Sequence, residues 1–166
     1  GLHTKLKGVV MRELGVAADA VRGMATQTDQ VPNTSATAAS SGSDLNGQAV
    51  RIACDTIKER LLPVAAALLT SEAGATIPAD SVVFSDGAVS SPLAKGVSIP
   101  FGKVVEAAYF QRISLSATGF YQTPNLGYDP AKGKGRPFFY FAYGAAVSEV
   151  EIDGFSGMKR VLAVDI

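Results

Sequence analysis

The stretch from Val31 to Gly47 constrains the fold most, because it concentrates small and hydroxylated residues directly before a helical pattern. Its first thirteen residues, Val31–Ser43, carry no charge and only one sizeable apolar side chain, so a core of its own cannot hold this loop. The loop offers hydrogen bonding instead. Hydroxyls come from Ser35, Thr37, Ser40, Ser41 and Ser43, and open backbone N–H groups from Ala36, Ala38, Ala39 and Gly42.

The residues after this loop predict a helix that points its amino-terminal end back toward it. Asp44 is predicted to be the N-cap, and Gln48 and Ala49 begin the apolar periodicity. Unpaired N–H groups and the positive end of the helix dipole would then stabilise an anionic ligand, such as a phosphate or a pterin-like group. A solvated linker rich in Ser, Ala and Gly is the alternative, and composition alone leaves both open.

Composition excludes several classes of protein. At 166 residues with 47% apolar and 18% charged residues, the chain is expected to form one globular domain. The net charge of zero gives no electrostatic signal for nucleic acid or an anionic membrane surface, and the apolar run 61–69 is too short to span a bilayer. One cysteine excludes an internal disulfide, and residues 1–15 lack the pattern of a signal peptide. A cytoplasmic location is therefore expected.

Apolar periodicity predicts three helices. The first spans 2–14 and ends at Gly15, and the second spans 49–62 with a kink or an end at Pro63 and a further turn or two over 64–69. The third begins near Pro100 and runs to residue 112, with Val104, Val105, Ala108 and Tyr109 as its apolar face. Residues 70–76 are predicted to be a linker.

Alternating patterns predict the strands. A short strand is expected within 16–28, a hairpin of 81–84 and 88–91 around Ser85-Asp86-Gly87, and a strand over 113–121. Residues 122–137 should form an exposed excursion, and 138–153 should pair with 158–166. These elements predict an α+β fold with helices packed on a mixed or antiparallel sheet. Its two parts are a helix-loop-helix part, 1–70, with the loop at 31–43, and a part of hairpin, helix and antiparallel strands, 77–166.

Several residues carry reactive groups, and each has a structural interpretation that we prefer. His3, the only histidine, is expected to lie on a helix surface or to pack, and Cys54 is expected to be a small buried hydrophobe. No cysteine or histidine pair has zinc-ligand spacing. The predicted assignments for the remaining groups are a solvated strand face for Glu149, Glu151 and Asp153, a mobile basic turn for 133–136, and core packing for Phe138, Phe139, Tyr140, Phe141 and Tyr143.

Four blocks of the sequence resemble molybdenum hydroxylases of the xanthine dehydrogenase type, in their molybdopterin-binding part. The blocks are Gly1-Leu2-His3-Thr4-Lys5, the segment 29–47 with its core Thr37-Ala38-Ala39-Ser40-Ser41-Gly42-Ser43, the segment 114–124 and the segment 140–153. They follow the order of the family and span nearly the whole chain. In that family the first block lies inside a much longer polypeptide, so the chain is expected to be a segment of a larger molybdopterin-binding domain.

The resemblance implies an activity and a cofactor site. Such enzymes hydroxylate xanthine and hypoxanthine to urate with oxygen from water, at a molybdenum that the pterin cofactor holds. The loop residues Thr37, Ala38, Ala39, Ser40, Ser41, Gly42 and Ser43 would contact the cofactor. The backbone of Ala39 would lie nearest the molybdenum, with Ala38 beside it in the substrate pocket.

The resemblance also implies what other segments supply. The family's catalytic glutamate and its substrate-orienting residues match nothing in this chain, so no catalytic residue is assigned here and the isolated chain is expected to be inactive. FAD and 2Fe–2S clusters would belong to other domains or to partner subunits, and the substrate would be a purine. Two alternatives are an aldehyde oxidase-type enzyme or one that acts on another heterocycle, and a non-catalytic structural or partner-binding domain.

Overall fold

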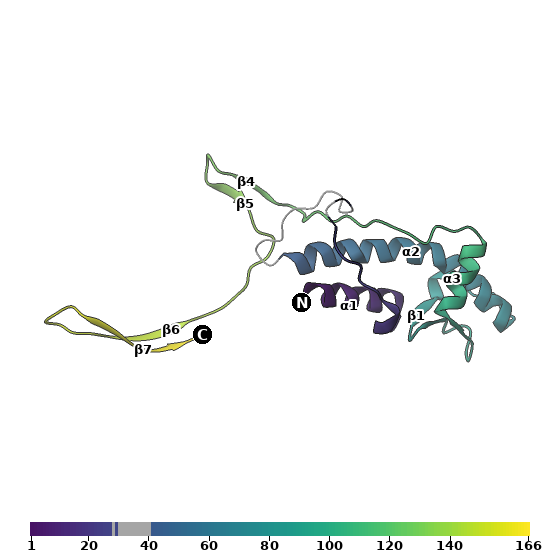
Figure 1. The fold of residues 1–166 in the computed structure, drawn as a ribbon, viewed down its shortest axis with the longest axis horizontal. Helices are drawn as coiled ribbons and strands as arrows, with labels where there is room; N and C mark the ends of the chain where they lie inside the picture. The colour runs from purple at the N-terminus through teal and green to yellow at the C-terminus, as the bar shows by residue number, and fades with distance from the viewer. Residues whose placement is uncertain (28, 30–40) are drawn as a thin grey trace. The chain divides into compact units, whose positions relative to one another are not determined.

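The computed structural model describes residues 1–27, 29 and 41–166, and the chain forms two compact units, Gly1–Gln122 and Thr123–Ile166 (Figure 1). The first unit contains α1 (Leu2–Leu14), η1 (Ala18–Ala20), α2 (Gly42–Ala73), η2 (Ala79–Ser81), β1 (Val83–Ser85), β2 (Ala88–Ser90), β3 (Ser98–Pro100) and α3 (Phe101–Phe110). The second contains β4 (Gly127–Asp129), β5 (Lys134–Arg136), β6 (Val147–Ile152) and β7 (Lys159–Asp165). The α+β class predicted from the sequence is confirmed.

Helix α1 has the predicted bounds and ends at Gly15, whose φ of 63° is left-handed. A Cβ at Gly15 would also lie 2.5 Å from the backbone of Phe84, so glycine is required there twice over. The strand predicted within 16–28 is wrong for the described residues, which form only the short turn η1. The apolar alternation there is weak, and Met24 is 78% exposed, so no buried face stabilises a strand.

Helix α2 continues through Pro63 to Ala73, so the prediction of a linker at 70–73 is wrong. Pro63 faces solvent, while Leu61, Val64 and Leu69 on either side of it are buried. Burial of a leucine contributes about 1.5–3 kcal/mol, so these residues together outweigh the roughly 3 kcal/mol that a proline costs inside a helix. The helix ends at Gly74, with a φ of 66°, whose N–H donates to the carbonyl of Thr70.

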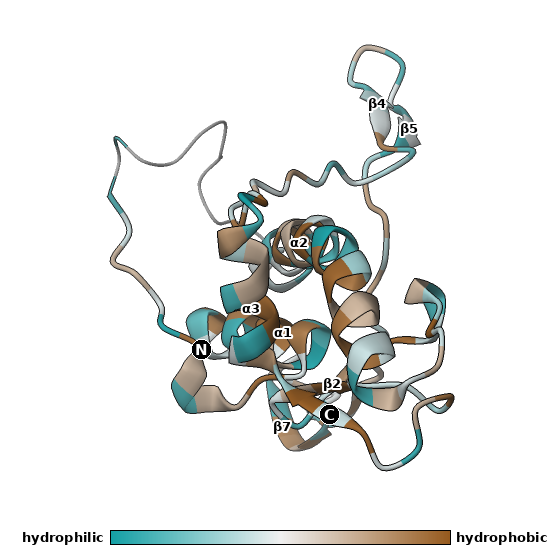
Figure 2. Cartoon of the chain, turned by 90° about the vertical axis from the view of Figure 1, so that its right-hand side faces the viewer, coloured by the Kyte–Doolittle hydropathy of each residue, from teal (hydrophilic) through white to brown (hydrophobic). Residues whose placement is uncertain are grey.

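A three-stranded antiparallel sheet, in the order β1-β2-β3, packs against the carboxyl-terminal half of α2 and against α3. The predicted hairpin is confirmed: its two-residue turn is Asp86-Gly87, and both residues have positive φ. Strand β3 was not predicted. Apolar colour gathers on β2 and the helices beside it (Figure 2), and the most deeply buried side chains are Leu61, Leu69, Val89 and Val104. The third helix begins after Pro100 as predicted, but Tyr109 is exposed and not part of its buried face.

Residues 113–122 run beside α2 without forming a strand, so the prediction of a strand over 113–121 is wrong in its hydrogen bonding. The predicted alternation is nevertheless present, because the odd-numbered residues from 113 to 121 are half-buried and the even-numbered ones are exposed. The segment packs on a helix, which offers no free backbone groups for a ladder.

The second unit consists of two antiparallel hairpins, β4–β5 and β6–β7. The pairing of β6 with β7 and the exposure of residues 122–137 are confirmed, although the hairpin β4–β5 inside that excursion was not predicted and residues 134–136 form its second strand. Of the strand predicted over 138–153, only Val147–Ile152 forms. Core packing of the aromatic residues at 138–143 is also wrong, because their exposed fractions run from 42% to 96%. Within the described residues, no helix combines the length and apolarity that crossing a bilayer requires.

Candidate functional site

The candidate site lies at the amino-terminal end of α2, where the predicted ligand loop meets the helix. Thr37, Ala38, Ala39 and Ser40 lie outside the described residues. Ser41, Gly42 and Ser43 are described: Ser41 is the N-cap residue, and Gly42 and Ser43 are the first two residues of the helix. The structure therefore places the last three predicted cofactor contacts at the positive end of a 32-residue helix.

Asp44 is not the N-cap, so that prediction is wrong. The N-cap is Ser41, three residues earlier, so the helix begins at Gly42, and the Leu45 N–H donates to the Ser41 carbonyl at 3.1 Å. Asp44 lies instead in the first turn, where a carboxylate interacts favourably with the helix dipole. Its Oδ1 atom is buried and has no hydrogen-bond partner among the described residues. A buried acceptor of this kind is stabilised when a donor reaches it, as the N–H groups of a pterin would.

Helix α1 is held to the start of α2 by Lys5, whose Nζ donates to Ser43 Oγ at 3.1 Å. The ammonium group adds positive charge beside the helix terminus. The two helices also meet at the buried Gly47, where a Cβ would lie 4.0 Å from the Val9 side chain, an ordinary van der Waals contact. Lys5 is thus positioned both to fix the hydroxyl of Ser43 and to favour an anionic ligand.

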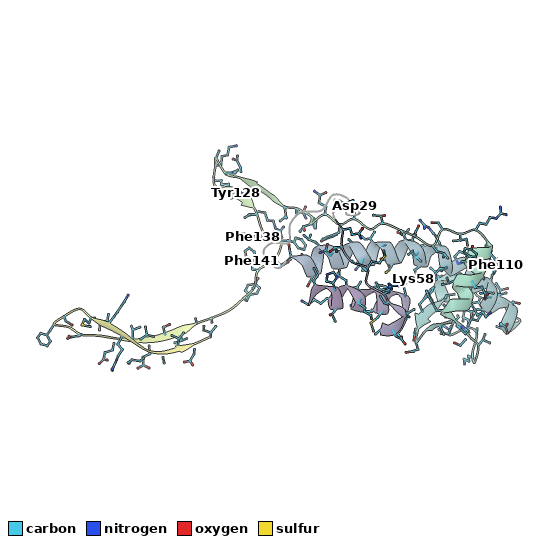
Figure 3. The ribbon with its side chains drawn as sticks, viewed as in Figure 1. Asp29, Lys58, Phe110, Tyr128, Phe138 and Phe141 are labelled. Carbon is cyan, nitrogen blue, oxygen red and sulfur yellow. The ribbon has the colours of Figure 1, made fainter. Side chains whose placement is uncertain are left out.

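A second contact between α1 and α2 lies about four turns further along α2, at Lys58 (Figure 3). Its Nζ donates to the Glu13 carbonyl at 3.2 Å and lies 3.6 Å from Glu13 Oε2 and 3.9 Å from Asp55 Oδ1. Lys5 and Lys58 therefore join the two helices near both ends of α1. This arrangement fixes the direction in which α2 presents its amino terminus.

The segment 113–122 covers the other side of the same helix. Arg60 Nη1 donates to the carbonyls of Ser114, at 3.0 Å, and Ser116, at 2.9 Å. Gly119 lies so close to α2 that an added Cβ would overlap the Ala49 carbonyl oxygen and would lie 3.0 Å from the Ala53 amide nitrogen. Two of the four family-like blocks, 1–5 and 114–124, thus supply residues packed on α2, and the block 29–47 contains the first residues of that helix.

Lys5, Arg60 and Gly119 were not singled out from the sequence as residues that position the site. The family resemblance could have pointed to two of them, because Lys5 and Gly119 fall inside two of the resembling blocks. Arg60 falls in none of the blocks. A lysine and an arginine on amphipathic helices are ordinary surface residues by pattern. Only the contacts in the folded protein show that Lys5 binds Ser43 and that Arg60 binds the segment 113–122.

The two other reactive side chains considered from the sequence, His3 and Cys54, lie on helices of the first unit. His3 is exposed on α1, and Cys54 is 5% exposed, as predicted for a small buried hydrophobe. Burial, followed by the nearby carboxylates of Glu13 and Asp55, raises the pKa of the Cys54 thiol, which is therefore neutral at pH 7. Within the described part of the chain, no group of three or more His, Cys, Asp or Glu residues could hold a metal ion.

A cavity of about 700 Å³ lies near the other end of α2 and is not part of this site. Its lining includes Leu68 and Glu72 of α2, Ile99 of β3 and Ala107 of α3. By helical rise, Leu68 lies roughly 38 Å from Ser43 along the axis of α2. The cavity is consequently too far from the loop to take part in binding there.

Comparison with known proteins identifies the class to which this fold and site belong. The whole chain, residues 1–166, matches the family described as "Molybdopterin cofactor-binding domain". The chain belongs to this family. The residues at the start of α2 fit such a cofactor, because they combine a helix amino terminus, a lysine beside it and a buried acceptor that no other described residue contacts by a hydrogen bond.

Individual proteins of known activity are similar to this chain. The chain is 42% identical over 166 residues to xanthine dehydrogenase/oxidase of Felis catus and 40% identical over 166 residues to xanthine dehydrogenase of Oryza sativa subsp. japonica. Each match covers the whole chain but only 10% of the relative, so the chain spans about a tenth of their length. The solved structure of quinoline 2-oxidoreductase from Pseudomonas putida 86 is 26% identical, with a TM-score of 0.63 over 97% of this chain and 19% of that one.

Proposed function

We propose that this chain is the part of a xanthine dehydrogenase-type molybdenum hydroxylase that supplies the cofactor loop. The observation that carries the proposal is the identity of 40–42% to xanthine dehydrogenases over all 166 residues. The packing of two family-like blocks, 1–5 and 114–124, on the helix that begins in a third block supports it further. A cofactor loop of this composition needs such a frame, because its residues cannot form a core of their own.

The proposed cofactor contacts are Thr37, Ala38, Ala39, Ser40, Ser41, Gly42 and Ser43. The bound cofactor would supply the molybdenum centre at which a substrate carbon is hydroxylated with oxygen from water. The chain's own residues bind and orient: backbone N–H groups at the start of α2 donate to the cofactor, and Lys5 fixes the Ser43 hydroxyl. Asp44 Oδ1, a buried acceptor, would be available to an N–H group of the bound cofactor. By the family resemblance, Ala38 and Ala39 would lie at the substrate pocket.

The complete reaction proposed is the hydroxylation of hypoxanthine and xanthine to urate by the longer polypeptide. The residues that move protons and orient the purine belong to segments outside this chain. FAD and 2Fe–2S clusters on other domains or subunits would remove the electrons. The 166-residue chain alone is therefore expected to be inactive.

A second candidate is a molybdenum hydroxylase that acts on another heterocycle or on an aldehyde. The observation that favours it is the likeness to quinoline 2-oxidoreductase, with a TM-score of 0.63. The two candidates share the loop and its frame and differ in the pocket that other segments complete. Turnover of quinoline or benzaldehyde against xanthine separates them.

The experiment uses the native full-length protein. We expect about one molybdenum per polypeptide by elemental analysis, and ¹⁸O in urate formed in H₂¹⁸O. Lys5→Met should lower the molybdenum content severalfold, whereas Lys103→Met on the exposed surface of α3 should leave it unchanged. A native protein without molybdenum would refute the proposal. Turnover of quinoline or benzaldehyde without xanthine turnover would replace the first candidate by the second.

A further inference from the structure

The cavity of about 700 Å³ near the carboxyl-terminal end of α2 has walls from three elements of the first unit. Leu68 comes from α2, Ile99 from β3, Val97 from the turn before β3, and Ala107 from α3. Ile99 is buried and the other three are half-buried, so the floor of the cavity is apolar. All four belong to the core of this unit or pack against it, so the floor is formed without a ligand. Small-molecule sites have a similar size, about 300–1,000 Å³.

An exposed aromatic ring lies at the edge of this cavity. Phe110, the last residue of α3, is part of the lining and is 73% exposed (Figure 3). Its ring packs edge to face with the ring of Tyr109, with the two centroids 5.7 Å apart, which restricts its movement. An apolar body that covers such a ring is removed from water, and the face of the ring also attracts cations. The cavity therefore combines an apolar floor with an aromatic edge.

The lining also contains three exposed charged residues, Glu72, Lys103 and Glu106. Lys103 Nζ donates to Glu106 Oε2 at 2.8 Å, and this hydrogen bond raises the pKa of Lys103. The two charges of this pair compensate each other. Glu72 makes no hydrogen bond or ion pair with another residue in the part of the chain that the structure describes. The cavity consequently carries one negative charge that its own lining does not compensate.

This charge distribution selects among possible ligands. The carboxylate of Glu72 would repel an anion, and an anion that bound Lys103 would have to displace Glu106. An uncharged ligand would cover the apolar floor but would leave the carboxylate of Glu72 without a partner. A ligand that joins an apolar body to a positively charged group matches the floor, the ring of Phe110 and the carboxylate of Glu72 together.

We propose that this cavity binds a small organic cation, in which an aromatic or aliphatic body carries an ammonium group. The body lies on the floor formed by Leu68, Ile99 and Ala107, and the ammonium group faces Glu72. The site is separate from the cofactor loop, because Leu68 lies roughly 38 Å from Ser43 along α2. Binding at this cavity is therefore independent of the function proposed for the loop.

Three ligands with a common body test the selection for positive charge. Tryptamine, tryptophol and indole-3-propionate share an indole ring and a two-carbon linker, and they end in an ammonium, a hydroxyl and a carboxylate group. Their affinities for the full-length protein are measured by titration with saturation-transfer NMR. We expect tryptamine to bind about 2–5-fold more tightly than tryptophol, the factor typical of an exposed ion pair. Indole-3-propionate should bind more weakly than tryptophol.

Two substitutions locate the bound ligand. Glu72→Gln should bring the affinity for tryptamine within twofold of that for tryptophol and should leave tryptophol unchanged. Glu59→Gln is the matched control, because it removes the same charge from an exposed position of α2, roughly 20 Å away along the helix, and should change none of the three affinities. Ala107→Phe should fill the floor of the cavity and weaken all three ligands at least tenfold.

Thermal unfolding of each variant shows whether it is folded, and the two glutamate variants decide the outcome if Ala107→Phe is not. Absence of tryptamine binding would overturn the proposal, and so would equal binding of the three ligands. Equal effects of Glu72→Gln and Glu59→Gln would show that the charge of Glu72 is not in contact with the ligand. Binding that neither Glu72→Gln nor Ala107→Phe changes would place the ligand elsewhere on the polypeptide and would also overturn the proposal.

Discussion

Gly119→Ala should loosen the frame that holds the candidate site, although it adds a single methyl group. The added Cβ would overlap the Ala49 carbonyl oxygen and would lie 2.7 Å from the Ala49 carbonyl carbon and 3.0 Å from the Ala53 amide nitrogen. All three atoms belong to the backbone of α2, so no side-chain rotation relieves the overlap. The segment 113–122 must move away from the helix.

The magnitude follows from two contributions. Forcing one extra carbon into a packed contact costs about 1–3 kcal/mol. Movement of the segment would also weaken the hydrogen bonds from Arg60 to the carbonyls of Ser114 and Ser116, each contributing about 0.5–1.5 kcal/mol before allowance for their exposure. We therefore expect the opening free energy of this part of the protein to fall by about 1–3 kcal/mol from the overlap alone, and by more if both hydrogen bonds are lost.

Native-state hydrogen exchange of the full-length protein, resolved to peptides by mass spectrometry, measures this opening. A loss of about 1–3 kcal/mol corresponds to roughly 5–150-fold faster exchange in the first half of α2. Gly8→Ala is the matched control, because a Cβ at Gly8 has no atom within 4 Å and the residue lies inside α1. There the same substitution should stabilise the helix by about 0.5–1 kcal/mol.

Faster exchange in Gly119→Ala together with slower exchange in Gly8→Ala would support the close contact between Gly119 and α2, because the two substitutions are chemically identical. If Gly119→Ala changed exchange in α2 by less than twofold, the close approach of residues 113–122 to α2 would be refuted. Faster exchange confined to residues 113–122, with α2 unchanged, would show that the segment does not brace the helix. The molybdenum content of the same samples then tests whether the frame matters for cofactor retention.

Three further predictions concern the same unit. Leu61→Ala should lower the free energy of unfolding by about 2–5 kcal/mol, because Leu61 is 0% exposed and its truncation opens a cavity. Leu93→Ala should lower it by under about 0.5 kcal/mol, because Leu93 is 62% exposed. Hydrogen exchange of α2 checks both values. Burial raises the pKa of the Cys54 thiol, so folding should lose stability as the pH rises above the ordinary value of 9.0, and thermal unfolding of Cys54→Ala should lack this decline. Lys58→Met should speed exchange in α1 about 2–5-fold, while Lys103→Met should not.

Local patterns predicted the elements that depend on local chemistry. The helix ending at Gly15 and the hairpin around Asp86-Gly87 follow from periodicity and from residues that accept positive φ. The failure at Pro63 has a tertiary cause, since burial on both sides of the proline stabilises a helix that its sequence alone would interrupt. A kink or an end predicted from a proline therefore depends on which face the ring occupies.

Strand predictions failed where the partner was not a strand. Residues 113–121 alternate as a strand should, yet they lie on α2 and form no ladder. Residues 138–146 have the composition of a buried strand, yet only the part opposite β7 is one. An alternating or apolar pattern indicates which side chains of a segment are expected to be buried. A strand also requires a neighbouring backbone with free hydrogen-bond donors and acceptors.

For the candidate site too, the sequence indicated some of the residues, and the structure showed how they are held together. Resemblance located the loop residues 37–43 and two of the blocks that pack beside them, but it gave no reason for those blocks to meet. The structure supplies the reason in the contacts of Lys5 with Ser43 and of Gly119 with Ala49, from opposite ends of the first unit. A loop made of serine, alanine and glycine cannot fix its own conformation, so the precision needed at a cofactor has to come from neighbouring elements. Substitutions at Lys5 and Gly119 should therefore affect cofactor binding as strongly as substitutions in the loop.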